Sequence, residues 1–387
     1  MTPFRFIAAT GVLLALSVPC SAVTRAAPTH KVGLGKVLTS EGQGQIFGFD
    51  INREGNDGVL ATASSVQIFD QDKGKILKAI GHSKTSDSDY VVYGIAAGDV
   101  GLVDHEVVPE GEIFPKRHYL VMNPVSGQKF TGKWTPTQHQ IIAQQMSEDQ
   151  SSAITSVFAL AGLKQDEVPL LLVSDVAANT FSQVFHLDPD LFGLNTGPNL
   201  AQYTAANQAV FALSPDGGAV GGVAPINVLI DLSNGKQTQF NGYNNGFFHA
   251  GAVNGLAVDP NAGIAATTTE LNAQVEFYDL KKMSGITFAQ LPCTGATDQL
   301  NSGTTIANDP LNKLFLVVEP NYCDGSQGSA LLVYNERGKL VNTIAGFTLP
   351  KDAVINPPPR INPSKRMGWL YGGPDGDGRN QLTQFFY

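Results

Sequence analysis

Charged residues are scarce in this sequence, and basic residues are scarcer than acidic ones. Only 15% of the 387 residues are charged, and 34 acidic against 25 basic side chains give a formal net charge of −9. No basic stripe runs along the chain to offset this balance. An acidic chain of this kind has no electrostatic basis for binding nucleic acid or an anionic membrane, so neither is expected as a partner.

Familiar catalytic motifs are also absent. The sequence has no Gly-x-Ser-x-Gly elbow, no phosphate-binding loop and no dinucleotide fingerprint. Residues 375–380 begin like a calcium-binding loop but lack the distant glutamate that completes one. Their Asp-Gly pairs favour a hairpin turn instead. The sequence therefore predicts no resident cofactor, with a divalent metal as the alternative considered below.

A long apolar run occurs only at the N-terminus. Arg5 precedes the apolar residues 6–18, and the small residues 20–22 form a cleavage site, as in a secretory signal peptide. Pro19 interrupts the run before it could span a bilayer. We therefore expect residues 1–22 to be a signal peptide, 23–30 a linker, and the protein to be secreted or periplasmic without a membrane span. A lipid anchor retained at Cys20 is the alternative, although residues 17–19 match a lipobox poorly.

Glycine and proline are plentiful, at 41 and 22 residues, and they separate short apolar segments that repeat. Residues 205–344 contain three copies of a four-strand pattern with a period of about 45 to 55 residues, which is typical of β-propeller blades. The strands are expected at 209–216, 219–223, 227–231 and 235–239, at 255–260, 263–268, 274–279 and 284–287, and at 305–310, 313–318, 330–335 and 338–341.

The two ends of the chain complement each other. Residues 35–38 resemble the outer strand of a repeat, while three inner strands are expected at 353–357, 367–371 and 381–387. A composite last blade that the N-terminal strand completes would leave no open sheet edge. With further blades at 45–80, 90–134 and 140–194, the sequence predicts an all-β, seven-bladed β-propeller forming one domain over 31–387. Six or eight blades stay open because the first strand of the blade at 140–194 could also be a helical turn.

Consecutive apolar residues support this architecture. Residues 314–318 and 331–334 are apolar at successive positions, as in a sheet that is covered on both faces. A two-sheet sandwich would need alternation instead. The Ser-Pro, Asp-Pro and Asn-Pro pairs at 214–215, 259–260, 309–310 and 362–363 are expected in turns between first and second strands, so their acidic members are not catalytic candidates.

The cysteine usage fits an exported protein. Once Cys20 is removed with the leader, Cys293 and Cys323 remain, and an oxidising compartment favours a disulfide between them. Both are expected in loops at the same end of neighbouring blades. Two separate thiols are the alternative.

The repeated strands also resemble a known family. A strand ending in Asp-Pro, a strand ending in Tyr-Asp and a turn ending in Gly-Lys, as at 255–260, 274–279 and 338–339, are similar to the secreted YVTN and lactonase-like propellers, within the group that includes quinoprotein amine dehydrogenase heavy chains. The resemblance covers residues 31–387 and implies the fold. No catalytic motif of the family can be matched to numbered positions.

Candidate binding residues fall in loops at one end of the predicted ring. His82, His139 and His249 are expected in loops entering first strands, where they could converge on a metal, although their spacing matches no zinc pattern. The two most unusual loops, 83–89 and 240–249, add polar and aromatic side chains suited to a sugar or a peptide. The candidate ligand-binding set is His82, Asp87, Asp89, His139, Tyr243, Asn245 and His249.

Two functions follow from these residues. The first is an exported, non-catalytic scaffold, expected to be a monomer, that holds a small molecule, a carbohydrate or a protein on the face carrying loops 82–89, 137–139, 243–249 and 294–303. The alternative is a lactonase or hydrolase that uses metal-binding or general-base histidines at the central channel.

Overall fold

The computed structural model describes most of the strands and fewer of the loops. It describes residues 31–62, 65–81, 88–96, 100–107, 116–123, 128–131, 139–146, 152–159, 170–175, 180–188, 200–204, 207–213, 226–241, 253–269, 274–292, 305–320, 322–323, 328–350, 357–374 and 378–387. Within this part of the chain, no helix is long and apolar enough to cross a membrane.

The described residues form seven four-stranded antiparallel sheets and one short 3-10 helix, η1 (Glu41–Gln43). Six sheets are contiguous in sequence and contain four successive strands each. The first three comprise β2 (Ile46–Ile51), β3 (Asp57–Thr62), β4 (Ser65–Asp70) and β5 (Lys75–Gly81); β6 (Ser88–Ala96), β7 (Val100–Val107), β8 (Lys116–Asn123) and β9 (Gln128–Thr131); and β10 (His139–Met146), β11 (Ser152–Ala159), β12 (Leu170–Asp175) and β13 (Thr180–His186).

The next three sheets repeat this order. They comprise β14 (Leu200–Thr204), β15 (Gln208–Leu213), β16 (Ile226–Asp231) and β17 (Gln237–Asn241); β18 (Val253–Asp259), β19 (Ile264–Thr269), β20 (Gln274–Asp279) and β21 (Ser284–Gln290); and β22 (Ile306–Asp309), β23 (Leu314–Glu319), β24 (Ser329–Asn335) and β25 (Leu340–Phe347).

The seventh sheet joins the two ends of the chain. Its order is β1 (Gly33–Thr39), β28 (Gln381–Phe386), β27 (Met367–Tyr371) and β26 (Arg360–Asn362). β1 pairs antiparallel with β28, with Leu34 opposite Phe385 and Val37 opposite Thr383. The N-terminal strand is therefore the outer strand of a sheet whose other strands come from the end of the sequence, as the pattern at 35–38 predicts.

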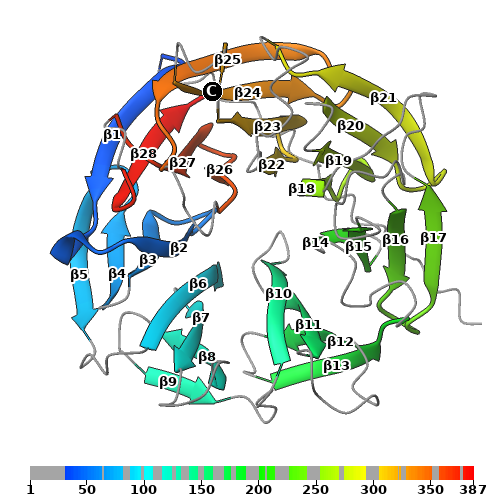
Figure 1. The fold of residues 1–387 in the computed structure, drawn as a ribbon, viewed down its shortest axis with the longest axis horizontal. Helices are drawn as coiled ribbons and strands as arrows, with labels where there is room; N and C mark the ends of the chain where they lie inside the picture. The colour runs from blue at the N-terminus through cyan, green and yellow to red at the C-terminus, as the bar shows by residue number, and fades with distance from the viewer. Residues whose placement is uncertain are drawn as a thin grey trace, which may run out of the picture.

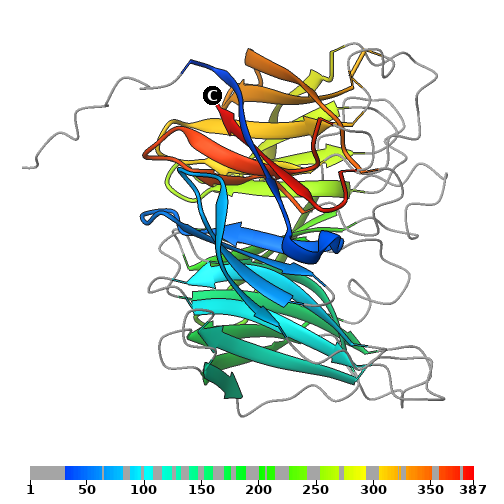
Figure 2. The ribbon, with the colours of Figure 1, turned by 90° about the vertical axis from the view of Figure 1, so that its left-hand side faces the viewer.

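The sheets stand around a common centre, with the first strand of each innermost (Figure 1). Each innermost strand contacts the innermost strand of the next sheet, from β2 through β6, β10, β14, β18 and β22 to β26, and β26 in turn contacts β2. In the side view, the blue strand β1 runs beside the red strand β28 (Figure 2).

The sequence assigned the first strand wrongly in two sheets, β14–β17 and the seventh. Residues 209–213 were expected to be a first strand, but they lie in β15, the second strand of its sheet, and β14 is the first. The pair Ser214-Pro215 misled the assignment by imitating the turns at 259–260 and 309–310, whereas the turn before β15 ends at Asn207, whose φ is 56°. The residues expected as the second strand, 219–223, lie outside the described residues.

In the seventh sheet the first strand is Arg360–Asn362. The sequence placed it at 353–357, because those residues are more apolar. The first strand of the sheet formed by 139–186 could have been a helical turn from the sequence. It is the strand β10, which pairs with β11.

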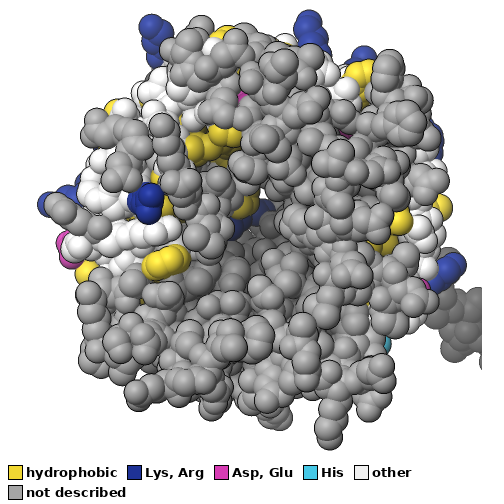
Figure 3. All heavy atoms as spheres, viewed as in Figure 1, with side chains coloured by type: hydrophobic (Ala, Val, Ile, Leu, Met, Phe, Trp, Pro, Cys, Tyr) yellow, Lys and Arg dark blue, Asp and Glu magenta, His cyan; other side chains and the backbone are white. Residues whose placement is uncertain are grey.

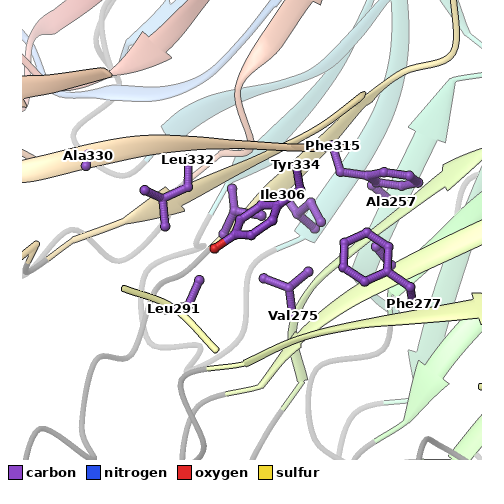
Figure 4. Packing of buried hydrophobic residues seen from close by; sticks show 11 residues of the cluster. Ala257, Val275, Phe277, Leu291, Ile306, Phe315, Ala330, Leu332 and Tyr334 are labelled. Carbon is purple, nitrogen blue, oxygen red and sulfur yellow. The ribbon is translucent and has the colours of Figure 1, made fainter. Parts of the chain in front are cut away.

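Apolar side chains fill the spaces between neighbouring sheets. β23 is buried at every position, whereas the outer strand β21 is mostly exposed. Between these two sheets, Phe277 of β20 packs edge-on against Phe315 of β23, with ring centroids 5.5 Å apart (Figure 4). Middle strands covered on both faces explain the consecutive apolar residues in the sequence.

The connections differ between the two ends of the sheets. At one end of each sheet, the first strand connects to the second and the third strand connects to the fourth; we call this end the turn face. We call the opposite end the loop face. Every turn-face connection has five residues or fewer. The loop face has connections of more than ten residues at 187–199, 214–225, 242–252, 291–305 and 348–359.

Side chains of Asp and Asn cap the described turns of the turn face. Asp259 Oδ1 accepts the backbone N–H groups of residues 261 and 262, and Asp309 Oδ1 accepts that of Asn312. Asp279 caps its turn in the same way. These aspartates have the turn role expected for the Asp-Pro pairs, and they fix the backbone of this face.

The last residue of the sequence links two sheets. The hydroxyl of Tyr387 donates to Asp309 Oδ2 at 2.8 Å, and both side chains are buried. Burial, which outweighs its hydrogen bonds, raises the pKa of Asp309. Burial first, and then the charge of Asp309, also raises the pKa of Tyr387.

Replacing Tyr387 with phenylalanine should lower the free energy of unfolding by about 1–2 kcal/mol, because a buried carboxyl loses one of its donors. Urea denaturation measures the difference. Tyr334→Phe is the matched control: its hydroxyl is buried and has no hydrogen-bond partner among the described residues. That control should be neutral or slightly stabilising. Equal losses in the two variants would contradict the role assigned to the Tyr387 hydroxyl.

Candidate functional site

Most of the predicted site residues lie outside the described residues. This applies to His82, Asp87, Tyr243, Asn245 and His249. For Asp89 and His139 the backbone is described: Asp89 is the second residue of β6, and His139 is the first residue of β10, not part of the preceding loop. Both positions are at the loop-face ends of innermost strands that contact each other. Whether the three histidines share a metal stays a prediction.

The predicted disulfide is described at one of its residues. Cys323, in the β23–β24 connection on the loop face, is disulfide-bonded and has a φ of 52°. Cys293 lies outside the described residues, so the pairing of these two residues stays a prediction.

An ion pair joins two of the innermost strands. Arg360 is the only Lys or Arg in the seven innermost strands. Its Nε is 3.6 Å from Asp50 Oδ1 and donates to the carbonyl oxygen of Phe49 at 3.2 Å, which joins β26 to β2. Both side chains of the pair are largely buried. The space-filling view shows a hollow near the centre of the face seen in Figure 1, with dark blue Lys or Arg atoms visible in it (Figure 3).

Two carboxyl groups meet on the turn face. The carboxyl of Glu336, in the β24–β25 turn, is an electrostatic neighbour of that of Asp259, the buried last residue of β18. Burial first, and then Asp259, raises the pKa of Glu336. Because burial and a second carboxyl nearby both disfavour the charged form, the environment favours the protonated form of Glu336.

The pair should make folding pH-dependent. A raised folded-state pKa means that the native state holds its proton more tightly than the unfolded chain, so this contribution to stability is present below about pH 4.5 and is lost as the pH rises through the raised value. The variant Glu336→Gln cannot lose this stabilisation as the pH rises. Between pH 4.5 and pH 8, its free energy of unfolding should therefore rise relative to that of the original protein, by no more than about 1 kcal/mol because the group is partly solvated. Urea denaturation at pH 4.5 and pH 8 tests the difference between the two proteins; parallel pH profiles would contradict it.

A groove on the turn face lies between the sheet β14–β17 and the sheet β18–β21. Its lining residues include the apolar Leu229, Pro260, Leu280 and Met283 and the basic Lys236 and Lys281. We call it the lysine groove. The lining comes from β15, β16 and β17 and from the turns that follow β16, β18 and β20.

Among the described residues, no group of three or more His, Cys, Asp or Glu side chains is placed to hold a metal ion. The histidines proposed as ligands from the sequence are outside that comparison, because their side chains are not described. The lactonase alternative stays a prediction.

Comparison with known proteins supports the fold. No family model and no curated protein matches the chain. Among solved structures, the structure of U3-55K is similar with a TM-score of 0.61 and 14% identity, over 92% of this chain and 98% of that one. The WD40 repeats of RRP9 match with a TM-score of 0.60, 14% identity and the same coverage.

These similarities place the chain in the β-propeller fold class. They do not support the narrower YVTN and lactonase-like group, which stays a prediction from the strand motifs. Because 1030 chains of solved structures match, the fold is widespread and does not select one activity.

The sequence did not single out Arg360, Glu336 or the lysine groove. Arg360 could have been noticed as the one basic residue of the first strands, once those strands were correctly placed. The groove had no such signal, because its lining is assembled from segments of two sheets.

Proposed function

We propose that the protein is an exported, non-catalytic β-propeller that holds a partner on its loop face. The observation that carries this proposal is the difference between the two faces: one end of the sheets has only short connections, and the other has five connections of more than ten residues. Long loops on a rigid scaffold are where binding residues concentrate. The similarity to WD40 propellers, a class that commonly serves as interaction platforms, agrees with a binding role.

The proposal also includes a closed ring, export, a disulfide and a monomeric state. The seven sheets are the blades of a closed ring, and the circuit of contacts between innermost strands supports this. Residues 1–22 direct export, Cys293 pairs with Cys323 in the oxidising compartment, and the mature protein is a monomer. Mass spectrometry of protein recovered from the secreting cell tests the first two features: the N-terminus should follow Ala22, and one peptide pair should be disulfide-linked.

Site-specific photo-crosslinking tests the binding face. A photoreactive residue at position 245 or 87, in the loops of the loop face, should yield an adduct of one defined mass in the native compartment. The same residue at position 337, in the β24–β25 turn, is the control and should yield none at that mass.

Two outcomes would contradict the proposal. One is a defined adduct from position 337 alone, which would move the binding site to the turn face. The other is lactone hydrolysis that depends on a bound metal and is lost in His82→Ala, His139→Ala and His249→Ala, which would favour the enzyme. Metal analysis of the purified protein and a panel of lactones provide these readouts.

A further inference from the structure

The lysine groove has unpaired positive charge in a chain that is acidic overall. Among the described residues, neither Lys236 nor Lys281 forms a salt bridge, whereas the neighbouring Lys282 pairs with Asp279 at 3.1 Å. Both groove lysines are exposed. In a chain with a formal net charge of −9, two lysines without a salt bridge in one groove form a local site of positive charge.

The one carboxylate of the groove is already satisfied within its own turn. Asp231 accepts hydrogen bonds from the backbone N–H and the hydroxyl of Ser233, at 2.8 and 2.6 Å, and from the amide of Asn234 at 2.8 Å. These bonds, with a smaller effect of Lys236, lower the pKa of Asp231. The Asp231 carboxylate is therefore hydrogen-bonded within its own turn. It does not neutralise Lys281, whose charge is available to a ligand.

The position of Lys281 is defined by its neighbours. Gly263 has a φ of 71°, and a Cβ atom placed there would lie 3.2 Å from Lys281 Cε. The stem of Lys281 thus lies over the glycine backbone. Buried Leu280 and Leu229 form apolar parts of the groove lining, and exposed Met283 adds a flexible apolar contact.

We propose that the lysine groove binds an acidic segment of a partner protein, with carboxylates at Lys236 and Lys281 and an apolar side chain between them. A small-molecule site would enclose most of its ligand. This groove instead has exposed lysines and an exposed methionine, which suits an extended peptide lying across two sheets. The site is on the turn face, so it is separate from the loop-face binding proposed above and does not depend on it.

Fluorescence anisotropy of the mature protein tests the proposal. The probe is a labelled eight-residue peptide in which Glu alternates with Leu and Val, and the control peptide carries Lys in place of Glu. We expect the acidic peptide to bind and the basic peptide not to bind. Lys281→Ala should weaken binding about three- to fivefold, as expected for loss of an exposed ion pair, and Lys281→Arg should largely restore it.

Charge reversal makes the test sharper. The double variant Lys236→Glu with Lys281→Glu should weaken the acidic peptide by more than about tenfold. It should also prefer the basic peptide. Lys282→Glu is the matched control, since it changes the same turn by the same charge at a lysine that is already paired; it should stay within about twofold of the original protein.

Three results would overturn the proposal. The first is no binding of the acidic peptide, and the second is binding that the double reversal leaves unchanged or that Lys282→Glu reduces equally. The third is Lys281-dependent binding of octanoate without binding of the peptide, which would identify the occupant as a small carboxylate. Unchanged thermal unfolding of each variant shows that the exposed substitutions affect binding and not folding.

Discussion

Replacing Phe277 with alanine is expected to lower the free energy of unfolding by about 3–5 kcal/mol. The side chain is fully buried between two sheets, where it packs against Phe315 and lies 6.4 Å, centroid to centroid, from the ring of Tyr334. Alanine would leave a cavity that neither sheet can fill without moving relative to the other. Urea denaturation followed by circular dichroism and tryptophan fluorescence measures the loss.

Phe288 provides the matched control. It is a phenylalanine of the same sheet, on the outer strand β21, with 37% of its surface exposed. Phe288→Ala should cost less than about 1 kcal/mol, as for most surface substitutions. Similar losses in the two variants would mean that the space between the sheets is not the source of stability at this position.

Deleting residues 31–39, which include β1, is expected to have a still larger effect. Its removal exposes the edge of β28 and takes away Leu38, which is 2% exposed and packs between the seventh sheet and the sheet β2–β5. Truncating such a leucine alone costs about 2–5 kcal/mol, and the deletion adds the lost strand pairing. We expect no cooperative unfolding transition, and association through the open strand edge. Size-exclusion chromatography and urea denaturation measure both.

A circular permutant separates the loss of the strand from the loss of its covalent position. Gly33 lies opposite Phe386, so a short glycine-rich linker can join residue 387 to residue 31, with new ends opened between β1 and β2. This protein should fold and remain monomeric, because β1 still pairs with β28. A stable, monomeric deletion variant, or a permutant that fails like the deletion, would contradict the structural role of β1.

The repeated strands could be predicted because sheets covered on both faces produce short apolar runs bounded by turn residues. This held for β23 and β24, which are buried at nearly every position. It failed for β14, whose sequence Leu-Ala-Gln-Tyr-Thr carries a weaker apolar signal. It failed again at β26, a strand of three residues that is too short for any periodicity.

The candidate sites could be predicted only in part. The sequence placed Asp89 and His139 in loops entering first strands on one face, because antiparallel sheets bring alternate connections to one face. The structure instead includes them in the first residues of β6 and β10 at that face. It could not assemble the lysine groove, since Lys236 and Lys281 belong to different sheets and become neighbours only when those sheets pack. It also could not pair Glu336 with Asp259, which lie on two adjacent sheets.

The pairing of β1 with β28 also constrains how the molecule is made. Synthesis delivers a chain from its N-terminus, so β1 must wait until β28 follows before it can pair with it. Throughout that interval the chain has no complete circuit of sheets. A chaperone that shields the waiting segment would therefore act early in biogenesis and leave only when the final residues arrive.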